Sequence, residues 1–158
     1  MTPTLSAVTP VRTATGADGP DIGRLLDQFN REYNDPTPGA DTVAARAAEL
    51  IETEEITVLL VGDGPDGIAV MRFRPSLWGS QPEAYLEELY VIAERRGEGL
   101  GRALLDRVIE LSRERDAAYV GLGTSAADTA ALGLYESTGF SNLERPGGPS
   151  MLWYELEL

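Results

Sequence analysis

Two adjacent acids, Glu87 and Glu88, stand inside a run of residues typical of a β-strand, from 83 to 92. Strand interiors favour β-branched and aromatic residues, so two neighbouring carboxylates there are unusual. A carboxylate whose pKa is shifted by its surroundings can accept a proton near neutral pH, which makes the pair a candidate for general-base chemistry. Strand alternation places Glu87 and Glu88 on opposite faces unless a bulge resets the phase. The competing interpretation is that one or both acids face solvent or pair with neighbouring arginines.

The residue types that are missing narrow the chemistry further. The chain of 158 residues has no His and no Cys, and all 13 of its basic residues are arginines. This excludes a cysteine nucleophile, a Ser-His-Asp relay, a thiolate and imidazole zinc site, a disulfide, and lysine-based chemistry. Proton transfer must therefore use a carboxylate, a tyrosine or a chain terminus.

The charge balance points to cationic partners. There are 26 acidic and 13 basic residues, which gives a net charge of -13. Such a chain is unsuited to nucleic acid. No stretch is long and apolar enough to span a membrane, and the first thirty residues lack the pattern of a signal peptide. We therefore expect a soluble cytoplasmic protein with no nucleic-acid or membrane partner.

A glycine-rich loop follows the acidic strand and leads into a periodic helix over about 100–115. Backbone N–H groups at such a helix start are unpaired, so the loop suits a phosphate group. The dinucleotide fingerprint G-x-G-x-x-G does not fit, because its third glycine would fall on Arg102 or on Leu104. A glycine loop without a ligand is the alternative.

The remaining elements predict a single α/β layered domain over 1–158, with a polar and partly ordered lead-in to about Gly19. Apolar spacing predicts helices over 21–33, 42–52 and 128–138. Short β-branched or apolar runs predict a hairpin of strands 56–61 and 68–73, then strands at 83–92 and 118–122. A final pair of strands is expected between Gly139 and Leu158.

Two motifs resemble the GCN5-related N-acetyltransferase (GNAT) superfamily. Residues 96–101, Arg-Gly-Glu-Gly-Leu-Gly, fit its Arg/Gln-x-x-Gly-x-Gly/Ala signature, and residues 131–140, Ala-Leu-Gly-Leu-Tyr-Glu-Ser-Thr-Gly-Phe, resemble its A-x-x-(L/F)-Y-E-x-x-G-F segment. The resemblance covers about residues 56–158. It implies a mixed, mostly antiparallel sheet of six to seven strands, with helices on both faces and a splayed strand pair at the coenzyme site. Asp128 departs from the family pattern, which often has Asn there.

The resemblance also implies roles for particular residues, with acetyl coenzyme A as cosubstrate and no metal. Glu87 corresponds to the proposed base and Glu88 to an acid that contacts the amine. The opposite assignment of the two roles stays open. Tyr135 is expected to donate a proton to the leaving thiolate, with a core tyrosine as the alternative. Trp78 either lines the acceptor pocket or covers the sheet. The residues expected to contact the coenzyme are Leu89, Tyr90, Val91, Arg96, Gly97, Glu98, Gly99, Leu100, Gly101 and Arg102.

The implied activity is transfer of an acetyl group to a primary amine by direct attack in a ternary complex, since no cysteine can hold an acyl intermediate. The acidic strand and the negative net charge favour a small cationic acceptor, such as a polyamine or an aminoglycoside. Two alternatives stay open: a non-catalytic module that binds acetyl coenzyme A, and acetylation of a peptide or protein amine. Homodimers are frequent among resembling proteins, so a homodimer is also expected.

Overall fold

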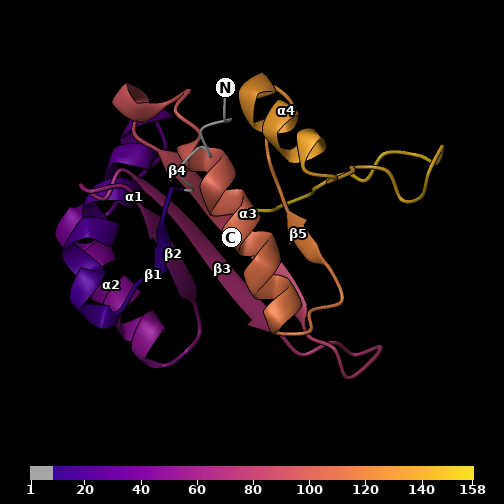
Figure 1. Cartoon of the computed structure of the whole chain (residues 1–158), viewed down its shortest axis with the longest axis horizontal. Coiled ribbons are helices and arrows are strands. Elements are labelled where there is room, and N and C mark those ends of the chain that lie inside the picture. Colours follow the sequence, from indigo (N-terminus) through magenta and orange to yellow (C-terminus); the bar gives the residue numbers. More distant parts are fainter. Residues whose placement is uncertain (1–8) are drawn as a thin grey trace, which may run out of the picture. The chain divides into compact units, whose positions relative to one another are not determined.

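The structure, a computed structural model, describes residues 9–158 and divides after Leu122 into two compact units (Figure 1). Residues 1–8 of the expected lead-in lie outside the described part, and the rest of the lead-in forms a short strand and a 3-10 turn. The elements of the first unit are β1 (Val11–Thr13), η1 (Gly16–Asp18), α1 (Gly19–Glu32), α2 (Ala40–Glu52), β2 (Thr57–Val61), β3 (Gly67–Arg74), β4 (Glu83–Val91), η2 (Ala93–Arg95), α3 (Leu100–Glu114) and β5 (Val120–Leu122).

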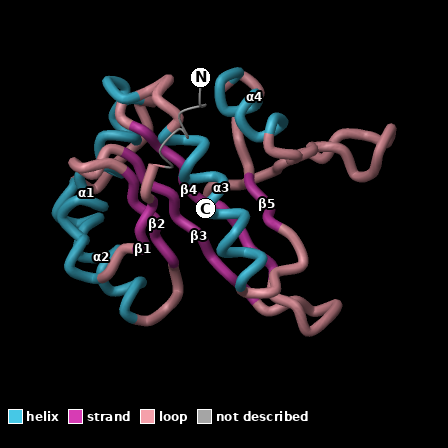
Figure 2. Tube along the Cα trace, viewed as in Figure 1, coloured by secondary structure: helices cyan, strands magenta, loops and turns pink. Residues whose placement is uncertain are grey.

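The described strands form one sheet of five, in the order β1-β2-β3-β4-β5 (Figure 2). Neighbouring strands are antiparallel except β4 and β5, which are parallel. The predicted mixed, mostly antiparallel sheet is therefore confirmed, but the predicted count of six to seven strands is too high. Strand β1 was not predicted, because three residues are too short to show an alternating pattern.

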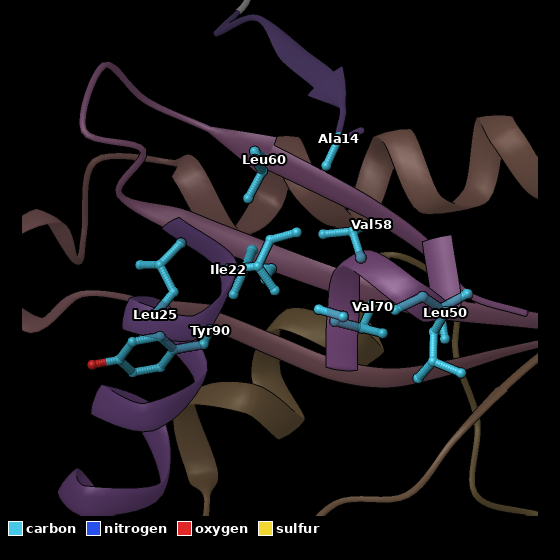
Figure 3. Packing of buried hydrophobic residues seen from close by; sticks show 11 residues of the cluster. Ala14, Ile22, Leu25, Leu50, Val58, Leu60, Val70 and Tyr90 are labelled. Carbon is cyan, nitrogen blue, oxygen red and sulfur yellow. The ribbon is translucent and has the colours of Figure 1, made fainter. Parts of the chain in front are cut away.

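Helices cover both faces of this sheet. Figure 3 shows Ile22 and Leu25 of α1 and Leu50 of α2 packed with Val58 and Val70, residues of one core cluster. The alternate residues of the same strands point to the other face, where α3 packs. Strand β2 reads Val-Leu-Leu-Val from 58 to 61 because it is buried on both sides. The layered arrangement predicted from the sequence is confirmed.

Helices α1 and α2 cross at a glycine. A Cβ atom on Gly23 would lie 2.2 Å from the carbonyl oxygen of Ala40 and 2.8 Å from Cβ of Ala44. Only a residue without a side chain allows the two backbones to approach this closely. The crossing fixes the separation of α1 and α2 above the sheet, and with it the width of the space between them.

The second unit, residues 123–158, contains α4 (Thr129–Ser137) and no strand among its described residues. The expected pair of strands between Gly139 and Leu158 is reduced to one isolated bridge, Leu143 with Ser150. The chain between them reads Pro-Gly-Gly-Pro from 146 to 149. These residues form the turn enclosed by the bridge, and the chain outside the bridge, before Leu143 and after Ser150, forms no ladder. The prediction of a final strand pair is wrong for this unit.

Candidate active site

A β-bulge in β4 falls between the two glutamates. Val70 of β3 pairs with Glu88, whereas the next residue, Met71, pairs with Leu86. Glu87 is therefore an extra residue that has no partner on β3 in the backbone register. An extra residue of this kind resets the alternation of the strand. The two acids consequently share one face, instead of the opposite faces that regular alternation predicts.

That face is the one covered by α1 and α2, and it contains a pocket of about 270 Å³. Both glutamates line it, together with residues from both helices and from β3. Most of the lining is apolar, and the complete set is Ile22, Leu26, Pro38, Thr42, Val43, Arg46, Ala47, Leu50, Ile56, Val70, Arg72, Glu87 and Glu88. The volume lies at the lower end of the range for small-molecule sites, about 300–1,000 Å³.

The two acids differ in their surroundings. Glu87 accepts a hydrogen bond from Nε of Arg72 at 2.6 Å, across the β3–β4 pair. Glu88 makes no hydrogen bond or ion pair with any described residue. Burial raises the pKa of the Glu88 carboxyl above its ordinary value, and the negative charges of Glu87 and Asp35 raise it further. The Glu88 carboxyl therefore keeps its proton to a higher pH than an ordinary glutamate does.

Beyond the bulge, β4 is no longer paired with β5, because β5 ends at Leu122. The parallel pairing joins residues 84–86 to residues 120–122 and, within the described chain, goes no further, although β4 continues to Val91. Leu89, Tyr90 and Val91 lie in this continuation, so their edge toward β5 is not occupied by that strand. The splayed strand pair expected at the coenzyme site stays a prediction.

The glycine loop begins just after β4. Gly97 and Gly99 have φ angles of +79° and +85°, in the left-handed region where a side chain is strained. No atom lies within 4 Å of a Cβ built on either glycine, so the loop is open on that side. Gly99 is the N-cap of α3, and no side chain caps this helix start. The first N–H groups of α3, from Leu100 to Arg102, are therefore available to an anion.

The arginines around this loop are engaged by the protein itself. Arg96 donates from Nε to the carbonyl oxygen of Val91 at 3.0 Å, pairs with Glu32, and lies over the ring of Tyr90. Arg102 pairs with Asp106 at 3.0 Å. Because these guanidinium groups have carboxylate partners, the attraction of the loop for a diphosphate rests mainly on backbone amides.

Asp66, a buried acid in the β2–β3 turn, fastens the segment that leads into the loop. Its carboxylate accepts a hydrogen bond from Nη1 of Arg95 at 2.9 Å, and its backbone carbonyl accepts one from Ile92 at 2.9 Å. Arg95 also donates to Glu98 inside the loop, at 2.8 Å. The turn between β2 and β3 thereby sets where the glycine loop starts.

The other predicted residues are placed as follows. Trp78 lies in the β3–β4 loop, is 90% exposed and is not part of the pocket lining. Tyr135 lies in α4 of the second unit, with its ring centroid 5.9 Å from that of Phe140. Burial, with a contribution from the charge of Asp128, raises the pKa of Tyr135 to about 12. Asp128 caps α4 by accepting a hydrogen bond from the backbone of Ala131 at 3.1 Å.

Three residues of this site were not predicted from the sequence. Arg72 lies near Glu87 across the sheet, and only the register of β3 and β4 reveals this. Glu32 and Asp66 meet Arg96 and Arg95 from positions distant in sequence. No spacing rule links such pairs, so one sequence alone carried no signal for them.

Comparison with known proteins identifies the family to which the chain belongs. Residues 23–140 match the sequence profile of the acetyltransferase (GNAT) family. A crystal structure of an acetyltransferase from Arthrobacter sp. FB24, whose function is assigned only by inference, superposes with a TM-score of 0.89, at 42% identity over 98% of this chain and 99% of that one. This chain belongs to the acetyltransferase (GNAT) family, as its two motifs predicted.

Individual relatives act on different acceptors. A mycothiol acetyltransferase from Beutenbergia cavernae is 36% identical over 83% of this chain and 44% of its own length. A ribosomal protein bS18 alanine N-acetyltransferase from Escherichia coli is 41% identical over 37% of this chain and 40% of its own. The chain thus spans less than half of these curated relatives.

Two further features of the described residues bear on ligands. Residues 9–158 contain no group of three or more acidic side chains arranged to hold a metal ion. In the same range no helix has the length and apolar character needed to cross a membrane.

Proposed function

We propose that the chain transfers the acetyl group of acetyl coenzyme A to a small cationic primary amine by direct attack in a ternary complex. The observation that carries this proposal is the bulge in β4. It places Glu88 in the pocket on the sheet face covered by α1 and α2, where no described residue forms a hydrogen bond or ion pair with it. Family membership supports the donor. The glycine loop offers backbone N–H groups to its diphosphate, and the open edge of β4 offers a place for its thioester arm.

Glu88 is the proposed proton acceptor, and it takes the role that the family resemblance first assigned to Glu87. A primary alkylammonium has a pKa near ~10.4, so most of the acceptor is protonated at neutral pH. The amine loses a proton to Glu88, and its nitrogen then attacks the thioester carbonyl. The C–N bond forms, the C–S bond breaks, and the thiolate leaves with a proton. A raised pKa suits Glu88 to this work, because a base is most effective when its pKa lies near the working pH.

Tyr135 is the proposed donor of the proton to the thiolate. With a pKa raised to about 12, its hydroxyl remains protonated over the whole range in which the enzyme would be assayed. Tyr135→Phe removes only the hydroxyl, so we expect kcat to fall at least tenfold while the dissociation constant for coenzyme A stays within about twofold. Unchanged kcat would remove this role from Tyr135 and leave the tyrosine as a packing residue.

The two glutamates provide a matched pair of variants for the main test. Glu88→Gln keeps the shape of the side chain and removes its basicity, so we expect acetyl transfer to fall about 10²- to 10⁴-fold. Glu87→Gln should have a smaller effect, because Glu87 is already neutralised by Arg72. Thiol release from acetyl coenzyme A would be followed with a panel of amines, and coenzyme binding by calorimetry.

The outcomes separate this function from its alternatives. Coenzyme binding without amine-dependent thiol release across alkylamines, polyamines, aminoglycosides and peptides would indicate a non-catalytic binding module. Equal activity of wild type and Glu88→Gln would show that another group accepts the proton. Acetylation of peptides alone would replace the small amine by a macromolecular acceptor.

A further inference from the structure

The lining of the pocket contains four charged side chains. Two acids, Glu87 and Glu88, line it together with two bases, Arg46 and Arg72. Arg72 neutralises Glu87 at 2.6 Å, while Arg46 pairs at 2.8 Å with Glu49, which lies outside the lining. Glu88 is therefore the one lining acid that no described cation neutralises. An ammonium group finds a single counter-charge inside the pocket.

Apart from these charged residues and Thr42, the wall of the pocket is apolar. Ile22 and Leu26 come from α1, Val43 and Leu50 from α2, and Val70 from the sheet. A charged group placed against such side chains loses its hydration without a compensating partner, which is costly. A methylene group in the same place gains by leaving water.

We infer that the acceptor is a monoamine with an apolar stem, and that the pocket discriminates against polyamines and aminoglycosides. This inference rests on the proposed function and narrows the acceptor that the sequence suggested. The ammonium group lies at Glu88, and the stem lies along the apolar wall between α1 and α2. Arg72 is the residue that determines this selectivity. It neutralises the charge of Glu87, the second carboxylate that a polyamine would need.

Asp35, which is not part of the pocket lining, also acts on the Glu88 carboxyl. Asp35 is exposed in the turn after α1, and its charge reaches Glu88. It can attract cations toward the entrance, as the net charge of the chain also does. An exposed carboxylate in water gives little selectivity between one and two positive charges, so it does not replace a second acid within the pocket.

The test compares amines of equal size. n-Hexylamine and 1,5-diaminopentane each have seven non-hydrogen atoms and differ in a terminal methyl or ammonium group. We expect kcat/KM to be at least about tenfold higher for n-hexylamine, since its far end enters an apolar wall. From propylamine to hexylamine, kcat/KM should rise about threefold to fourfold for each buried methylene until the pocket is filled. Equal or better use of the diamine, or no dependence on chain length, would overturn the inference.

A variant pair tests the role of Arg72 directly. Arg72→Gln releases the charge of Glu87 into the pocket, and we expect the diamine to gain about tenfold relative to the monoamine. Arg74→Gln is the matched control, because Arg74 stands two residues further on the same strand and pairs with Glu83 at 2.7 Å, outside the pocket lining. The control should leave the ratio within about twofold of wild type. An unchanged ratio in Arg72→Gln would remove Arg72 as the determinant.

Binding measurements separate failure of this inference from failure of the proposed function. The same amines are titrated calorimetrically into the protein with coenzyme A present. If no amine is acetylated, the proposed function fails, but tighter binding of n-hexylamine than of 1,5-diaminopentane would still support the monoamine pocket. Tighter binding of the diamine would refute it whether or not turnover occurs.

Discussion

Gly23 gives the most direct test of how α1 and α2 are held together. Replacing it by alanine adds one methyl group at the crossing of the helices. That carbon would lie 2.2 Å from the carbonyl oxygen of Ala40 and within 2.9 Å of two atoms of Ala44. These contacts belong mostly to the backbone, so no flexible side chain can move aside. The two helices must separate by about 1 Å to reach ordinary contact distances.

The expected free-energy change combines two opposing effects. Alanine in a helix interior is favoured over glycine by about 1 kcal/mol. Overpacking of a tight contact costs about 1–3 kcal/mol, and the separated helices also lose part of their dispersion energy. The 2.2 Å contact with a backbone atom places the cost of overpacking in the upper part of this range, so we expect Gly23→Ala to lower the free energy of unfolding by about 1–2 kcal/mol. For a chain of this size, this corresponds to a decrease in Tm of about 2–8 °C.

The assay is urea unfolding followed by circular dichroism, with Gly133→Ala as the control. Gly133 also lies inside a helix, but no atom lies within 4 Å of its added Cβ. The control should therefore be neutral or stabilising by up to about 1 kcal/mol. Because the crossing sets the width of the pocket, Gly23→Ala should also raise the KM for the amine more than the KM for acetyl coenzyme A. A Gly23→Ala protein as stable as wild type would refute the reasoning.

Two further predictions concern charged residues. Asp66→Asn weakens the charge-assisted hydrogen bond to Arg95, by about 1–2 kcal/mol for a partly exposed guanidinium. Steady-state kinetics should therefore show an increase of about 5- to 30-fold in the KM for acetyl coenzyme A. The KM for the amine should stay within about twofold of the wild-type value. The raised pKa of Glu88 means that the folded state binds its proton more tightly than the unfolded chain, so ionised Glu88 destabilises the fold above this pKa. Glu88→Gln should accordingly be more stable than wild type in urea at pH 7.5, and the difference should narrow as the pH falls toward the ordinary pKa of glutamate. A difference that grows at low pH would contradict the assigned direction.

The parts of the fold that depend on local pattern were predictable from one sequence. The spacing of Ile22, Leu25 and Leu26 predicted α1, and the turn residues from 62 to 67 predicted the hairpin of β2 and β3. The glycines from 97 to 101 predicted the start of α3. Each of these signals arises within a few residues. The prediction of two strands after Gly139 was wrong, because strand pairing depends on a partner that the local sequence does not specify.

The positions of the two candidate acids depend on strand register, which one sequence does not specify. The sequence indicates that Glu87 and Glu88 occupy a strand, but strict alternation separates them. A single extra residue opposite Val70 and Met71 reverses this result and directs both acids to one pocket. The same register sets Arg72 against Glu87, which leaves Glu88 as the unneutralised acid. Since one residue of register decides which acid is neutralised, the proposed assignment of Glu88 as the base required the paired strands and not the motif alone.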